Sequence, residues 1–171
     1  MKIETLLWLL PIVFMFHDFE EIIMMKAWLD KNADKVASQF PFISKLLFKQ
    51  KNLSTAAFAL EVAEEFIIIS IITFFAVEWD LYSLWTGLLL VFFIHLILHV
   101  VQFIVYRKYV PVIITSILSI PYCIYAIISI SGYVNWTTVL FLSLILLVAA
   151  ILNLRFCFWL GEKFQKILEP H

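Results

Sequence analysis

The sequence predicts an all-α protein: a polytopic membrane helix bundle with five transmembrane helices and one amphipathic interfacial segment. Composition is the first reason, because 64% of the 171 residues are hydrophobic and 15% are charged, against about 45–50% and about 25% in soluble domains. The second reason is that the apolar residues form five long runs, and a helix needs about 20 such residues to cross a bilayer. The length suits a single transmembrane bundle over residues 1–171 rather than two domains.

The five runs follow one another along the chain, with one long connection between the first and the second. The predicted spans are residues 3–25, 54–77, 81–106, 109–131 and 136–160. Within the long connection, segment 30–50 carries apolar residues at the spacing of one helix face, between lysines: Val36, Phe40, Ile43 and Leu47. We expect this segment to lie in the membrane interface, with Pro41 breaking or bending its helix. It would act either as a surface anchor or as a lid over the polar residues described below.

Basic residues gather on alternate connections of the predicted bundle. They are six lysines between residues 26 and 53, Arg107 and Lys108 in the third connection, and Arg155, Lys163 and Lys166 at the last end. The second connection carries Glu78 and Asp80 instead, and the fourth is uncharged. The positive-inside rule then predicts an integral protein, which we expect in the plasma membrane, with the N-terminus outside and the C-terminus in the cytoplasm.

Charge and cysteine content exclude several other classes of protein. The net charge is −1, and the chain has neither a basic tail nor a glycine-rich phosphate loop, so we expect no nucleic-acid partner. Cys123 and Cys157 stand alone in apolar runs, so we expect neither a disulfide nor a thiolate metal site.

Ionisable side chains inside three of the apolar runs form the candidate site. They are His17, Glu20, Glu21, Glu61, Glu64, Glu65, His95 and His99. In each run these residues recur at positions i, i+3 or i+4, which share one helix face. With a rise of about 1.5 Å per residue, all three groups lie on the order of 6–17 Å below the predicted cytoplasmic surface. This shared depth predicts one site in the cytoplasmic half of the bilayer.

Charge balance favours bound cations at this site. An ionised side chain near a helix centre costs about 3 kcal/mol, so five uncompensated glutamates would cost roughly 15 kcal/mol. Lysine and arginine are missing from the middle of every predicted span. Carboxylate and imidazole ligands suit iron, manganese or zinc. His17 and Glu20 also reproduce, in reverse order, the Glu-x-x-His pair of di-iron bundles. We therefore predict two divalent metal ions, with iron favoured and zinc or manganese as alternatives.

Individual roles follow from position. Glu21 and Glu65 are the candidates for catalytic groups, while Gln102, Asn153 and Tyr106 could hydrogen-bond to the ligands from outside. Thr115 and Ser116 lie at a similar depth. For each of these five residues taken alone, an interhelical hydrogen bond is the favoured alternative to contact with the ligands. Asp18 points away from the Glu20 face, so we do not expect it to be a ligand. The alternative for the whole cluster is a set of protonated acids that lock the helices together through His–Glu hydrogen bonds.

At His17-x-x-Glu20-Glu21 the sequence resembles the HXXEE family, a group of small integral membrane proteins named for this motif. The second glutamate-pair helix and the His-bearing helix that follows it fit the same layout. The family has no assigned activity, so the resemblance implies a functional polar cluster in the membrane and no particular reaction.

Three functions suit these features. The first is a membrane-embedded metalloenzyme whose apolar surroundings favour a lipid-like substrate: oxidase- or hydroxylase-like with iron, a hydrolase with zinc. The second is a proton or divalent-cation transporter that uses the same glutamates and histidines. The third is a structural or partner-binding membrane subunit.

Overall fold

A computed structural model describes residues 1–168, and all of its regular elements are helical. The elements are α1 (Ile3–Gln39), η1 (Pro41–Ile43), α2 (Ser44–Lys51), α3 (Thr55–Glu78), α4 (Tyr82–Tyr106), α5 (Ile113–Ile130), η2 (Ser131–Tyr133) and α6 (Trp136–Leu168). The predicted all-α class is therefore confirmed over the described chain.

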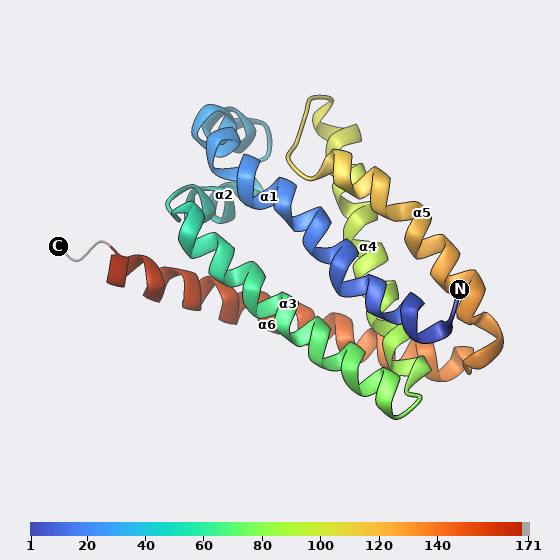
Figure 1. Ribbon diagram of the computed structural model, residues 1–171. Coiled ribbons are helices and arrows are strands. Elements are labelled where there is room, and N and C mark those ends of the chain that lie inside the picture. The colour runs from blue at the N-terminus through green and yellow to red at the C-terminus, as the bar shows by residue number, and fades with distance from the viewer. Residues whose placement is uncertain (169–171) are drawn as a thin grey trace.

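The five long helices pack as neighbours around a common core. α1 lies beside both α3 and α5, α3 also packs on α6, and α4 contacts α5 and α6 (Figure 1). The fully buried side chains at the centre include Leu7, Leu10, Trp85, Leu89 and Leu96. α2 and the connection between α4 and α5 lie at one end of this arrangement, and the turn between α3 and α4 lies at the other (Figure 1).

The distribution of polarity is inverted relative to a soluble protein. Many large apolar side chains are exposed on the outer faces, among them Ile12 and Ile23 on α1 and Ile67 on α3. Conversely, His17 and Asp18 are buried. A soluble protein rarely exposes such large continuous apolar surfaces, whereas lipid tails accept them without cost.

Three helices are long and apolar enough to cross a membrane, not the five that the sequence predicted. They are Tyr82–Tyr106, the stretch Ile113–Tyr133 formed by α5 and η2, and Trp136–Leu168. The physical reason lies in the acidic residues of the other two helices. Asp18, Glu20 and Glu21 interrupt the apolar run of α1, and three glutamates within five residues interrupt that of α3.

Helix boundaries agree with the predicted runs at most ends but not at the first connection. α1 begins at Ile3 as predicted but continues without a break to Gln39, so a separate interfacial helix does not start at residue 30. No proline or glycine interrupts residues 12–40, and Leu29, Ala33 and Val36 stay buried along this extension. The predicted break at Pro41 is confirmed, because η1 begins there and α2 follows in a new direction (Figure 1). α6 likewise continues beyond residue 160 to Leu168.

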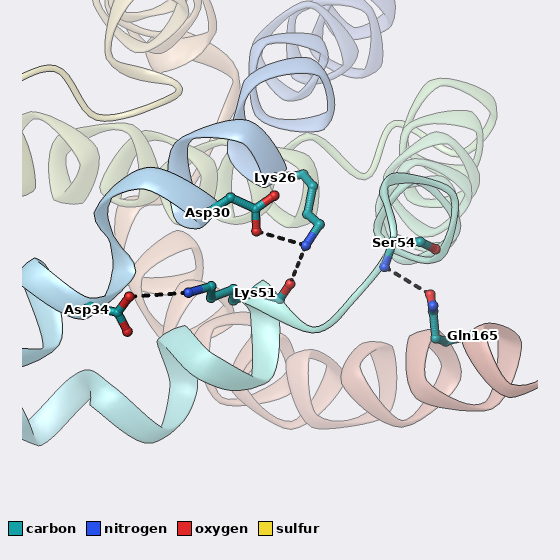
Figure 2. Close-up of polar contacts among 6 residues, drawn as sticks. All are labelled: Lys26, Asp30, Asp34, Lys51, Ser54 and Gln165. Atoms are coloured by element: carbon teal, nitrogen blue, oxygen red, sulfur yellow. Dashed lines mark hydrogen bonds and ion pairs between the residues drawn. The ribbon is translucent and has the colours of Figure 1, made fainter. Parts of the chain in front are cut away.

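Polar contacts hold the long connection against the bundle (Figure 2). Lys26 Nζ donates to Asp30 Oδ1 at 3.0 Å and to the Lys51 carbonyl at 2.8 Å, which ties α1 to the end of α2. Lys51 pairs in turn with Asp34 at 3.5 Å. The backbone N–H of Ser54 donates to Gln165 Oε1 at 2.9 Å, which links the start of α3 to the end of α6. The first connection is therefore a folded part of the structure.

Candidate metal centre

The structure divides the eight predicted site residues into separate groups. His17, His95 and His99 meet between α1 and α4, and their potential ligand atoms all lie within 4.8 Å of one another. Glu20 hydrogen-bonds to α5 and to the connection before it. Glu21 and the three glutamates of α3 belong to a different region, between α1, α3 and α6. Within residues 1–168, none of these four forms a hydrogen bond or ion pair with the three histidines.

The three histidines present the same ring atom to one another. The Nε2 atom of His95 lies 3.0 Å from Nε2 of His99 and 3.4 Å from Nε2 of His17. Zn–N bonds of about 2.0–2.1 Å at tetrahedral angles separate their ligand nitrogens by about 3.3–3.4 Å. The separation of 3.4 Å matches this value and that of 3.0 Å is somewhat shorter, while the potential ligand atoms of the remaining pair lie within 4.8 Å.

Helix geometry and packing explain this convergence. His95 and His99 are one turn apart on α4, so their rings project from the same face. His17 approaches from α1 and is completely buried, while Phe92 packs edge-on against its ring with centroids 5.9 Å apart. Leu96, between the two α4 histidines, is buried in the core and fixes the rotation of α4. His95 itself is only half-buried, so the group borders the outer surface of the bundle.

The outer nitrogens of two rings have polar partners. His99 Nδ1 lies 3.0 Å from Gln102 Oε1, and His17 Nδ1 lies 3.3 Å from Thr115 Oγ1. Histidines that bind metals almost always engage their second nitrogen in this way, which fixes the ring orientation. Gln102, which the sequence suggested as an outer partner of the ligands, thus contacts one of the three histidines. Thr115, which the sequence analysis treated as an interhelical contact, occupies the equivalent position at His17.

Glu20 is held at the N-terminus of α5. Its Oε2 accepts the backbone N–H of Thr115 at 2.8 Å and the Thr115 hydroxyl at 2.7 Å, while its Oε1 accepts the Tyr109 hydroxyl at 2.8 Å. α5 has no side-chain cap of its own, since its N-cap residue is Val112. A carboxylate is favourable there, because the first N–H groups of a helix lack intrahelical partners and carry partial positive charge.

The conformation of the connection before α5 allows Tyr109 to contact Glu20. Val112 adopts the left-handed conformation with φ of 73°, which is uncommon for a β-branched residue, and it is fully buried. Trp28 Nε1 donates to the Tyr109 carbonyl at 2.9 Å and holds the same segment on α1. Burial and the hydrogen bond to Glu20 raise the pKa of the Tyr109 phenol to about 12, so the phenol stays protonated as the donor.

A second polar group lies between α1 and α3. Asp18 and Glu61 are 3% and 4% exposed, and both interact electrostatically with Glu21 and Glu65. In the described part of the chain, Asp18 Oδ2 and Glu61 Oε1 have no hydrogen-bond partner. Glu61 packs on Gly161 of α6 so closely that a Cβ at position 161 would lie 2.0 Å from Glu61 Oε1.

Glu64 and Glu65 face polar atoms of α6. Asn153 Nδ2 donates to Glu64 Oε2 at 3.0 Å, and Cys157 Sγ donates to the same oxygen at 3.1 Å. Cys157 Sγ also lies 3.8 Å from Glu65 Oε1. Asn153, which the sequence suggested as an outer partner of ligands, thus serves the acidic group and not the histidines. Cys157 and Cys123 are both free and buried, in line with the predicted absence of a disulfide.

Several residues make contacts that differ from those expected from the sequence. The Tyr106 hydroxyl is buried without a hydrogen-bond partner among the described residues, and its ring packs edge-on against Trp28. Asp18 lies apart from Glu20, as its helix position implied, but it joins the acidic group. Sequence reasoning missed Tyr109 entirely. Its only signal was a polar aromatic residue next to the predicted start of a span, which interfacial anchoring explains equally well.

Comparison with known proteins adds the family and nothing more specific. No curated protein and no solved structure matches the chain. A family model described as "Protein of unknown function with HXXEE motif" matches residues 8–126, a stretch that contains all three histidines, Glu20 and Thr115. Because this match covers well over half of the 171 residues, the chain belongs to the HXXEE family, whose function is unknown.

Proposed function

We propose that this chain is a membrane-embedded metalloenzyme whose metal ion is held by His17, His95 and His99. The observation that carries the proposal is the convergence of three Nε2 atoms at 3.0 and 3.4 Å, close to the edges of a tetrahedral coordination sphere. Three protein ligands leave the fourth position of a tetrahedron open, which is the arrangement of catalytic rather than structural zinc sites.

The number of protons on the imidazole rings supports a bound cation between the three histidines. A neutral imidazole carries one N–H, and the amide oxygen of Gln102 can only accept, so His99 keeps its proton on Nδ1. His99 therefore directs a lone pair into the cluster. Without a cation, a single N–H of His95 would have to serve both of its Nε2 contacts at once. A metal ion instead accepts all three lone pairs.

The three histidine ligands favour one metal ion of the zinc type, whereas the sequence favoured a pair of iron ions. Carboxylate bridges are typical of di-iron bundles, but Glu20 caps α5 and Glu64 faces α6. Three neutral imidazoles suit zinc, and also copper, nickel or iron. When bound, such an ion would supply a Lewis acid and an activated water molecule. Glu21 and Glu65, proposed as catalytic groups, belong to the second polar group, so they would have to act on the metal centre from there.

We also propose that α1 and α3 cross the membrane, which gives five spans. The support is the way these helices are turned. Large apolar side chains such as Phe16 and Ile71 face outward, whereas Asp18 of α1 and Glu61 of α3 are buried. The arrangement of basic connections then favours a plasma-membrane protein with a cytoplasmic C-terminus and the histidines in the inner half of the bilayer.

A lipid-like substrate suits the position of the site. His95 is half-buried, and the neighbouring α4 residues Leu98 and Val101 are exposed on the apolar outer face. A molecule dissolved in the bilayer could therefore approach the open metal position laterally, along α4. The proposed reaction is hydrolysis of an ester or amide bond in such a molecule, by metal-activated water.

Metal content of purified protein tests the proposal. We expect about one equivalent of a transition metal per chain after mild purification, and a loss of that metal in His95→Gln and in His99→Gln. Glu64→Gln is the matched control, because the hydrogen bonds of Glu64 go to Asn153 and Cys157 of α6 and not to the histidines. Less than about 0.2 equivalents in the wild type, or full retention in both histidine variants, would contradict the proposal.

A transporter is the second candidate, and one observation favours it. Asp18 Oδ2 and Glu61 Oε1 are buried carboxylate oxygens without partners in the described structure, and such groups are typical of proton or cation relays. Proteoliposomes containing the protein would then show a proton or divalent-cation flux that Glu65→Gln abolishes and His99→Gln leaves in place. Absence of flux in the wild type would leave the enzyme as the better account.

A further inference from the structure

We infer that Thr115 and Glu20 are positioning residues of the metal centre, which fix the His17 ring so that its Nε2 lone pair faces the ion. This inference rests on the proposed function, because it assigns how one of the three ligands is held. It also gives the two residues of the motif different roles: His17 binds the ion, while Glu20 acts on His17 through a residue of another helix.

The hydroxyl proton of Thr115 decides the direction of the chain of hydrogen bonds. Its shortest contact is to Glu20 Oε2 at 2.7 Å, whereas the carbonyls of His17 and Val112 lie at 3.2 and 3.4 Å. Hydrogen bonds to a carboxylate are shorter and stronger than those to neutral acceptors. The proton therefore points to Glu20, and an oxygen lone pair is left for His17.

The protonation of His17 follows from that lone pair. Its Nδ1 lies 3.3 Å from Thr115 Oγ1, which can only accept there, so Nδ1 carries the ring proton. A neutral imidazole has one ring proton, and Nε2 is then free to bind a metal. This is the carboxylate–histidine–metal arrangement of known sites with one hydroxyl inserted between the carboxylate and the ring.

Glu20 suits this indirect role better than direct ligation. Three hydrogen bonds from α5 and its connection engage both of its oxygens. Turning the side chain toward the ion would break all three and leave the first turn of α5 uncapped. Hydrogen bonds to a charged group are stronger than those between neutral groups, so the loss of three of them makes that rotation unfavourable.

Three variants of neighbouring residues separate positioning from stability. Thr115→Val keeps the side-chain shape and the backbone N–H to Glu20 but removes the hydroxyl, whereas Thr115→Ser keeps the hydroxyl. Ser116→Ala is the matched control. Its hydroxyl is also buried in the first turn of α5, and it donates to the Val112 carbonyl at 2.6 Å without contacting the site.

The experiment measures Zn²⁺ affinity by competition and the visible absorption of bound Co²⁺, with full-length protein in nanodiscs. We expect Thr115→Val to weaken binding by about 10–100-fold and to alter the Co²⁺ spectrum, while Thr115→Ser and Ser116→Ala stay close to wild type. In metal-free protein, the ¹⁵N shifts of His17 should report a proton on Nδ1 in the wild type and a mixture of tautomers in Thr115→Val.

Different results would contradict the positioning role and the metal centre. Equal affinity, spectrum and tautomer in wild type and Thr115→Val would overturn the positioning role while leaving the metal centre intact. A wild-type protein that binds neither ion would overturn the metal centre itself. A weakening in Ser116→Ala equal to that in Thr115→Val would assign the effect to α5 packing and also overturn the positioning role.

Discussion

His17 and Glu20 lie one turn apart on α1, yet their side chains meet different partners. His17 turns toward two histidines of α4, and Glu20 turns toward the N-terminus of α5. Thr115 is the point at which the two environments touch, at 3.3 Å from the His17 ring and 2.7 Å from the Glu20 carboxylate. The motif therefore connects three helices through adjacent hydrogen bonds. We expect a substitution at one of these positions to alter the hydrogen bonds at the others.

Tyr109 offers a test of the Glu20 environment through pH. Burial and the Glu20 hydrogen bond raise the pKa of its phenol from 10.0 to about 12. Between these values the unfolded chain has lost a proton that the folded chain retains, so stability falls as pH rises. We predict that the wild type loses more unfolding free energy than Tyr109→Phe over this range. Equal slopes for the two proteins, measured by denaturation in detergent, would rule out the contact.

Absorbance of the tyrosinate ion gives an independent reading of the same contact. The difference between wild type and Tyr109→Phe should show one phenol that ionises well above the ordinary pKa of 10.0. A Tyr109 signal that titrates at this ordinary pKa would contradict the hydrogen bond to Glu20.

Sequence reasoning identified the histidines and glutamates but grouped them too broadly. Helical spacing predicts which side chains share a face, and it placed His95 with His99 and Glu61 with Glu64 and Glu65 correctly. It carries no information on the rotation of one helix against another. That rotation sends His17 to α4, and Asp18 and Glu21 toward α3. Thr115 could not be assigned for the same reason, since its role depends on where α5 begins relative to α1.

At the scale of helices, the contact between α3 and α6 depends on the absence of one side chain. Gly161 lets Glu61 lie against the α6 backbone, where an added Cβ would come within 2.0 Å of Glu61 Oε1 and 2.9 Å of Cδ. Glycine is unfavourable inside a helix by about 1 kcal/mol relative to alanine. A glycine at this position therefore indicates a packing requirement that outweighs helix propensity.

We predict that Gly161→Ala destabilises the protein by about 1–3 kcal/mol, as expected for an overpacked interior. Gly132→Ala is the matched control, because nothing lies within 4 Å of a Cβ at that position. Adding Glu61→Ala to Gly161→Ala should remove most of the clash, so the effects of the two substitutions would not be additive. Thermal unfolding in detergent measures four variants: Gly161→Ala, Glu61→Ala, the double variant and Gly132→Ala. Equal midpoints for Gly161→Ala and Gly132→Ala would contradict this packing.

Apolar periodicity predicted helix ends well where a turn residue or a change in polarity marks them. The ends of α3 and α4 fall within one or two residues of the predicted runs, because Ser54 caps one and a charged turn separates the two. α1 was predicted too short, since its polar extension beyond residue 25 resembles a surface segment. Tertiary contacts keep that extension helical, including the hydrogen bond from Trp28 to the Tyr109 carbonyl.

For the whole molecule, the number of helices that cross the bilayer depends on α1 and α3. Three qualify by length and composition, and α1 and α3 do not, because they carry the acidic residues. Of these acidic residues, Asp18 and Glu61 are buried, while apolar side chains such as Ile12 on α1 and Ile67 on α3 are exposed. Composition alone counts against a span in α1 and α3, whereas the burial of these two carboxylates supports the five spans that we propose. This is the expected behaviour of functional ionisable residues in a membrane bundle, which face the interior of the bundle.

Topology mapping tests the five-span arrangement. We predict that cysteines introduced at Ser131 and at Asp80 react with a membrane-impermeant reagent from one side, and those at Lys45 and Lys108 from the other. All four positions are exposed in the structure, so differences in labelling would not arise from burial within the fold. Cysteines at Lys45 and Asp80 that react from the same side would exclude a membrane-crossing α3.

The metal centre is the central claim, and X-ray absorption at the edge of the co-purifying metal tests it most directly. The account predicts a first shell of nitrogen and oxygen at about 2.0–2.1 Å if the metal is zinc, with the outer scattering of three imidazole rings and no second metal. A sulfur shell, a metal neighbour at about 3.5–4 Å, or scattering from fewer than two imidazoles would contradict it.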